Sequence, residues 1–105
     1  MKVFWSKTAL SQLKTIAYHN PFCSPKNLSD KIFKRTILLK KFPEMGSLQK
    51  FTKNTKIYKT HKYRYLVEGN YKILYYISEN NIRISLVFHT SQEPEKLSQF
   101  LENDL

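Results

Sequence analysis

Side chains that could do chemistry are sparse in this chain, and the most informative one ends a strand-like run. His89 closes the apolar run of residues 82–89. A histidine can accept or donate a proton near neutral pH, as RNA cleavage requires, and nearby cations can hold the phosphate. If the chain cleaves RNA, we therefore expect His89 to act as general acid or base, with Lys72 and Arg64 as the cations that hold the phosphate. The alternatives are a hydrogen-bonding histidine at a strand end and ordinary solvent-facing strand cations.

A second group of residues is suited to binding a partner without reacting. Positive side chains cluster between residues 50 and 72, where Glu68 alone opposes them. An arginine can fork two phosphate oxygens, and an exposed tyrosine can stack on a base, although packing under a loop is the alternative for the tyrosine. The candidates for nucleic-acid or target binding are Lys50, Lys53, Lys56, Lys59, Lys62, Arg83 and Tyr76.

The net charge is the strongest compositional feature. The 105 residues carry a formal charge of +10, from 18 Lys and Arg against 8 Asp and Glu. A small domain this basic is expected to meet a nucleic acid, an anionic membrane surface or an acidic protein, unless the charge serves only solubility.

The sequence lacks the motifs that are typical of several kinds of binding or catalytic site. There is no Gly-rich phosphate loop and no His/Cys cluster with metal-site spacing, so we expect no metal and no cofactor. The single cysteine, Cys23, cannot form an internal disulfide, which suits a reducing compartment. No apolar run approaches the roughly 18 residues of a membrane span, and no signal-peptide pattern opens the chain. We therefore expect a cytoplasmic protein that does not contact membranes.

The candidate residues sit on three strand-like runs between residues 63 and 89. Turn-forming residues at 68–70 and 79–81 separate the runs, which predicts an antiparallel meander. A two-residue turn at either 79–80 or 80–81 pairs the apolar sets on one face, and one of these registers places Lys72 beside His89. The apolar face is predicted to carry Tyr71, Ile73, Tyr75, Ile77, Ile82, Ile84, Leu86 and Phe88. The opposite, basic face is predicted to carry Lys72, Tyr76, Arg83 and His89.

The N-terminal part predicts an edge strand followed by two amphipathic helices. Residues 2–5 are a short apolar run, and Ser6 is a helix N-cap because its hydroxyl can accept a free N–H of the first turn. Pro21 stops the first helix. The second helix has Ser24 as its cap and Pro25 as its first residue, and it ends near residues 42–43. The two helices form an αα-hairpin whose apolar stripe is expected to cover the apolar face of the meander.

The remaining segments complete a single-domain α+β prediction for residues 1–105. Residues 44–62 are irregular and basic, with a turn at Gly46, and are a candidate binding loop. Pro94 is predicted to open a short C-terminal helix. The expected fold is therefore a short N-terminal strand and an αα-hairpin packed on a twisted antiparallel β-meander, with a short C-terminal helix.

Several strings in this order are similar to a known family. They are VFWSKTALSQL, the SP that opens the second helix, KKFPEMG, KYRYLVEGNYKILYYI and ISLVFHTSQEPEKL. Together they cover almost the whole chain, which resembles the RelE/ParE superfamily of bacterial type II toxin–antitoxin toxins. The resemblance implies a compact toxin-like fold. It also implies an acidic antitoxin, encoded alongside, that wraps the toxin in a hetero-oligomer.

The resemblance implies two alternative targets. RelE-like toxins cut messenger RNA in the ribosomal A site as metal-independent endoribonucleases, whereas ParE-like toxins poison DNA gyrase. Lys72 stands where the central strand of the family usually has an arginine, and His89 ends the last strand as a histidine does in many members. Ser91 and Gln92 replace arginines that often follow, and Leu97 replaces a tyrosine. The alternatives are a non-catalytic basic nucleic-acid-binding module and an inactive family relic that only binds the antitoxin.

Overall fold

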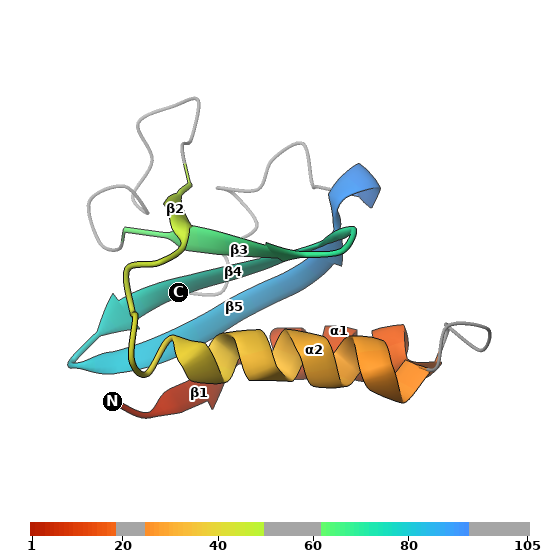
Figure 1. Cartoon of the computed structure of the whole chain (residues 1–105), viewed down its shortest axis with the longest axis horizontal. Helices are drawn as coiled ribbons and strands as arrows, with labels where there is room; N and C mark the ends of the chain where they lie inside the picture. Colours follow the sequence, from red (N-terminus) through yellow and green to blue (C-terminus); the bar gives the residue numbers. More distant parts are fainter. Residues whose placement is uncertain (19–24, 50–61, 93–105) are drawn as a thin grey trace.

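A five-stranded sheet with two helices on one face forms the described part of the chain (Figure 1). The computed structural model describes residues 1–18, 25–49 and 62–92. Its elements are β1 (Val3–Trp5), α1 (Lys7–Tyr18), α2 (Pro25–Leu38), β2 (Ser47–Leu48), β3 (Arg64–Glu68), β4 (Tyr71–Ser78), β5 (Asn81–His89) and the 3₁₀ turn η1 (Thr90–Gln92). The strand order is β1-β5-β4-β3-β2. The predicted α+β class and meander are confirmed, while the predicted C-terminal helix lies outside the described residues.

The sheet is mixed because its first strand runs parallel to its last. β1 lies at the edge as predicted, but it pairs with β5 in parallel, whereas all other pairs are antiparallel. Such a pairing needs a long crossover, and here the two helices and the rest of the sheet provide it. Neither α1 nor α2 is long and apolar enough to cross a membrane.

The helix boundaries follow local chemistry. The Ala9 N–H donates to Ser6 Oγ at 3.0 Å, which confirms Ser6 as the N-cap of α1. Pro25 is the first residue of α2, as predicted. This helix ends at Leu38, earlier than predicted, and turns continue the chain beyond it; the Lys40 N–H, for example, donates to the Ile37 carbonyl at 3.0 Å. The predicted stop at Pro21 and cap at Ser24 lie outside the described residues.

The main core lies between the helices and the sheet. Its buried residues are Ala9, Ile16, Ile32, Leu39, Leu66, Ile73, Tyr75, Ile82, Ile84 and Val87. Trp5 of β1 and Phe33 of α2 stack at the margin of this core, with ring centroids 6.5 Å apart. The helices thus cover the face of β4 that the alternation pattern predicted to be apolar.

One residue of β5 breaks the predicted alternation. The turn is at Glu79 and Asn80, both with positive φ, as one of the two predicted registers required. Tyr75 then pairs with Ile84, but Leu74 pairs with Leu86, so Ser85 is an extra residue that forms a β-bulge.

The bulge reverses the faces of every later residue in β5. Val87 joins the helix-side core, whereas Leu86 and Phe88 turn to the opposite side. The prediction that Leu86 and Phe88 share a face with Ile84 is therefore wrong. His89, which was predicted on the basic face, follows Val87 to the helix side.

The face of the sheet opposite α1 and α2, here called the far face, has an apolar cluster of its own. Tyr63, Leu74, Leu86 and Phe88 are buried there, and Tyr65 and Tyr76 pack against them. The strands at the centre of the sheet are thus apolar on both sides. Lys72 and Arg83 lie on this face toward opposite ends of the β4–β5 hairpin.

Candidate functional site

Lys72 lies on the far face, away from the other two predicted catalytic residues. It pairs with Phe88 across β4 and β5, so the predicted register beside His89 is wrong. Its ammonium group lies 4.2 Å from the centroid of the Tyr65 ring, in cation–π geometry. Lys72 therefore presents a positive charge at the end of the far face that β3 and β4 share.

His89 lies on the helix side, where it packs against an aromatic ring. It pairs with Tyr71, and the two ring centroids are 5.3 Å apart with the planes nearly perpendicular. The Ser91 backbone N–H lies 3.1 Å from His89 Nδ1 and can only donate, so this nitrogen accepts. The ring proton of the neutral histidine is then on Nε2. In this geometry His89 caps the turn that follows β5.

Arg64 also lies on the helix side, where it fastens a turn. Its Nη1 donates to the Gly46 carbonyl at 2.9 Å and to the Glu44 carbonyl at 3.2 Å. A guanidinium that holds two backbone carbonyls fixes the chain between α2 and β2 to the start of β3. The predicted catalytic trio is thus divided between two faces of the sheet, and the two members on the helix side contact different segments.

Tyr75 was predicted only as a core residue, but its hydroxyl also holds the chain between α2 and β2 by two hydrogen bonds. Its buried hydroxyl donates to the Pro43 carbonyl at 2.8 Å and accepts the Gly46 N–H, 3.0 Å away. Burial raises the pKa of Tyr75 above its usual value near 10, although the Gly46 N–H and the Arg64 charge oppose this effect. The sequence offered one signal for this role: position 75 was predicted to be in the core, yet it carries a tyrosine, whose hydroxyl needs a hydrogen-bond partner, and not a phenylalanine.

The predicted binding residues of β4 and β5 come together at the other end of the far face. Tyr76 and Arg83 form a direct cross-strand pair. The Arg83 guanidinium carbon lies 4.8 Å from the centroid of the Phe4 ring, and the Tyr76 ring meets the Tyr63 ring edge-on at 5.2 Å.

The structure describes one of the five lysines that were predicted to bind nucleic acid or the target. Lys62 is exposed. Lys50, Lys53, Lys56 and Lys59 lie outside the described residues. Within residues 1–18, 25–49 and 62–92, no three His, Cys, Asp or Glu side chains gather as metal ligands would.

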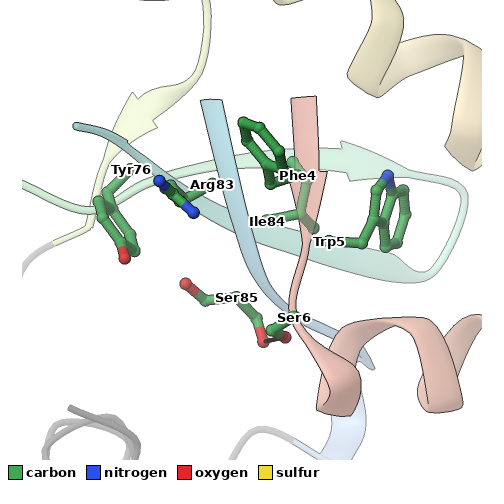
Figure 2. Close-up of a pocket in the computed structure, with 7 residues that line it drawn as sticks. All are labelled: Phe4, Trp5, Ser6, Tyr76, Arg83, Ile84 and Ser85. Atoms are coloured by element: carbon green, nitrogen blue, oxygen red, sulfur yellow. Dashed lines mark hydrogen bonds between the residues drawn. The ribbon is translucent and has the colours of Figure 1, made fainter. Parts of the chain in front are cut away.

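A pocket of about 180 Å³ opens beside Arg83. Figure 2 shows the Arg83 side chain between Tyr76 and Phe4, with Ser6 and Ser85 at the other side of the opening. The lining residues provide a cation, three aromatic side chains and hydroxyl groups, which suit binding of an anion or a flat group. Sequence reasoning missed Phe4, because nothing in residues 2–5 indicates which strand they pair with.

Two solved structures share this arrangement of helices and sheet. A chain of the chromosomal ParDE toxin–antitoxin system from P. aeruginosa matches with a TM-score of 0.64 and 15% identity, over 85% of this chain and 95% of that one. The YoeB dimer from Staphylococcus aureus matches with a TM-score of 0.56 and 16% identity, over 85% and 97% of the respective chains. The chain therefore shares the fold of these two proteins.

A comparison with family models identifies the protein family of the chain. The model described as the ParE toxin of the type II toxin–antitoxin system parDE matches residues 3–94. The chain belongs to this family of toxins, which confirms the resemblance read from the sequence. No functionally curated protein matches the chain.

Proposed function

We propose that the protein is a growth-inhibiting toxin that acts by binding its target, as ParE-like toxins act on DNA gyrase, and not by cutting messenger RNA. The separation of Lys72 from His89 carries this proposal. The two residues lie on opposite faces of the sheet, since Lys72 pairs with Phe88 and His89 pairs with Tyr71. A nuclease needs its proton-transfer group and its phosphate-binding cation at the same bond.

Side-chain rotation does not repair this separation. The backbone of β4 and β5 stands between the two groups, and their strands are tied by a continuous ladder on either side of the bulge. His89 Nδ1 is also occupied by the Ser91 N–H, and Arg64 holds the carbonyls of Glu44 and Gly46. These contacts support a structural role for each residue and leave the far face as the surface that meets the target.

The charge of the chain supports a second element of the proposal, an acidic antitoxin. A formal charge of +10 favours rapid association with an acidic protein. Lys72 and Arg83, at the two ends of the far face, are cations that such a partner would cover. In the proposed mechanism the antitoxin and the target compete for this surface, so toxin and antitoxin form an inactive hetero-oligomer.

The test is induced expression in a bacterium that lacks the antitoxin, with His89→Ala in parallel. We expect growth arrest with gyrase trapped on cleaved DNA, and we expect the arrest to persist in a folded His89→Ala variant. Lys72→Ala is expected to weaken the arrest, while Lys31→Gln, an exposed substitution on α2, serves as the charge-matched control.

Other outcomes decide between the remaining functions. Messenger RNA cut within codons by the native chain, and left intact with His89→Ala, would overturn the binding mechanism in favour of RNA cleavage. If the native chain causes no growth arrest, the protein would be an inactive family relic that only binds the antitoxin. Absence of arrest together with tight, strongly salt-dependent binding to naked nucleic acid would indicate a nucleic-acid-binding module.

A further inference from the structure

We propose that two copies of this chain associate through the outer edge of β1 and form a symmetric dimer. The two β1 strands run antiparallel, and the two Phe4 residues face each other across the two-fold axis. A strand edge without a partner, with exposed apolar side chains on both of its sides, points to this occupant. The inference goes beyond the proposed function, which does not set the oligomeric state.

The outer edge of β1 has backbone groups that another strand can use. β1 is the terminal strand of the sheet, and no strand of the described residues pairs with its outer edge (Figure 1). The Lys2 carbonyl and the Ser6 N–H bond to β5, at 2.8 and 2.9 Å. Since successive residues of a strand direct their backbone groups to opposite sides, the N–H and C=O of Val3 and Trp5 point to the outer edge.

Exposed apolar side chains lie on both sides of this edge. On the far face, Phe4 is 42% exposed. On the helix side, the C-terminal half of α2 lies beside β1, where Phe33 stacks on Trp5 (Figure 1). Phe33 is 47% exposed, and Ile37, one turn later on α2, is 43% exposed. Natural proteins usually protect a strand edge with charged side chains or proline, and residues 3–5 contain neither.

The direction of these backbone groups matches a two-fold axis. In an antiparallel pair, two residues whose backbone groups point at each other exchange two hydrogen bonds, and the next pair faces each other without bonds. Val3 of one copy therefore pairs with Trp5 of the other, and conversely, which gives four hydrogen bonds around the two Phe4 residues. Side chains of a pair without hydrogen bonds lie closest, with about 4.5 Å between the Cα atoms, so the two Phe4 rings cover each other.

The apolar character of the edge favours a second copy over an acidic partner. The Phe4 ring lies between the outer edge and Arg83, whose side chain is on the β4 side of β5 (Figure 2). Two copies of Arg83 are three strand spacings apart in the dimer, or about 14 Å, and salt screens charges beyond about 8 Å. In this register Lys2 faces Ser6 of the other copy, so the two Lys2 side chains do not oppose each other.

The exposed apolar area suits a weak dimer. An aromatic side chain has about 150–250 Å² of surface, so the exposed parts of Phe4 and Phe33 amount to about 60–120 Å² each. With Met1 and Ile37 the patch reaches roughly 250–400 Å² per copy, a size that is often functional on a monomer. Because β1 has three residues and allows four hydrogen bonds, we expect an interface below about 1,200 Å² in total, which is typical of transient assemblies.

The dimer leaves the far face of both copies accessible. The two-fold axis between antiparallel strands of one continuous sheet is perpendicular to that sheet. The helices of both copies therefore lie on one side, and both far faces lie on the other. Association at β1 is thus compatible with the binding of a target to the far face.

The test measures the mass of the purified chain by sedimentation equilibrium from about 10 μM to about 1 mM, which spans the affinities expected of small interfaces. We expect the mass to rise from one chain toward two, with a parallel shift in the emission of Trp5, the single tryptophan. Two chains of charge +10 repel each other, so the dissociation constant should fall about threefold to tenfold between about 0.05 and 0.5 M NaCl. Binding of an acidic partner has the opposite salt dependence.

Two variants assign the interface to this edge. Val3→Pro removes an outward N–H and leaves the hydrogen bonds between β1 and β5 in place, because an edge strand tolerates proline where its N–H faces solvent. We expect its dissociation constant to rise about tenfold or more, and Phe33→Lys, which puts a charge in the apolar patch, to act similarly. Leu48→Lys is the matched control, because Leu48 is also exposed but lies on β2 at the opposite edge of the sheet. Circular dichroism of each variant controls for folding.

Three outcomes would overturn the inference. The first is a native chain that stays monomeric up to about 1 mM at both salt concentrations. The second is a dimer that Val3→Pro and Phe33→Lys weaken no more than Leu48→Lys does, since its interface would then lie elsewhere. The third is a monomeric chain in which Val3→Pro weakens binding to the antitoxin encoded beside it; the edge would then belong to that partner, while the toxin function would stand.

Discussion

Replacement of Tyr75 by phenylalanine is expected to loosen the segment that joins α2 to the sheet. The substitution keeps the buried ring but removes a hydroxyl that bonds to both Pro43 and Gly46. Gly46 is buried, so its N–H would lose its partner without access to water, at a cost of about 1–3 kcal/mol. Pro43 is half-buried, and its carbonyl can bond to water at a cost of about 0–1 kcal/mol.

The expected loss for Tyr75→Phe is therefore about 1–4 kcal/mol, or a fall in Tm of roughly 5–30 °C for a domain of this size. Urea unfolding followed by the fluorescence of the single tryptophan, Trp5, measures it. Tyr71→Phe is the matched control, because its ring lies on the same face of β4 and its hydroxyl has no partner among the described residues. A Tyr75→Phe loss no larger than that of Tyr71→Phe would refute the reasoning.

The same variant also tests how the free energy of unfolding depends on pH. Because the pKa of Tyr75 is raised in the folded state, the native chain binds more protons than the unfolded chain above pH 10. The stability that the neutral phenol contributes is fully present below about pH 10 and decreases as the pH rises toward the folded pKa. The free-energy difference between the native chain and Tyr75→Phe should therefore shrink in that range. A difference that stays constant from pH 8 to 11 would contradict the assignment.

Three further substitutions test local structure. Gly46→Ala would place a Cβ 2.6 Å from the Tyr75 hydroxyl, so we expect a loss of about 1–3 kcal/mol in thermal unfolding, and a Tm equal to that of the native chain would argue against this contact. Ser6→Ala removes the acceptor for the Ala9 N–H and should cost about 1–2 kcal/mol in urea unfolding, with Ser6→Thr nearly neutral; an equal effect of both would dismiss the cap. Glu79→Gly relieves a positive φ of 52° and should add about 0.5–1 kcal/mol, and a destabilised variant would show that this turn is not strained.

The sequence predicted the elements well because their signals are local. Alternation over residues 71–77 and turn residues at 79–80 identify the hairpin, and Ser6 and Pro25 mark helix starts within a few residues of chain. The bulge at Ser85 has no such signal. The run Leu86 to Phe88 is apolar at every position, so it satisfies either face of the sheet equally well.

The contacts around the bulge come from a part of the chain that is remote in sequence. Gln12 Oε1 accepts the Val87 N–H at 2.7 Å, and Ser6 Oγ donates to the Ser85 carbonyl at 2.8 Å. These partners are 75 and 79 residues away in sequence. The predicted placement of His89 on the basic face was wrong for the same reason, because it depended on an uninterrupted alternation along β5.

The bulge also determines on which face of the sheet the candidate residues of β5 lie. Arg83 precedes Ser85 and keeps its place on the far face beside Tyr76, whereas His89 follows it and turns to the helices. Without the extra residue, the alternation of β5 would bring His89 to the face of Lys72, as a nuclease requires. With it, Ser85 lines the pocket next to Arg83 and receives the hydrogen bond that fixes the start of α1. One inserted residue thus places His89 and Lys72 on opposite faces of the sheet and puts Ser85 in the wall of the pocket at Arg83, an arrangement that agrees with the proposed action by binding.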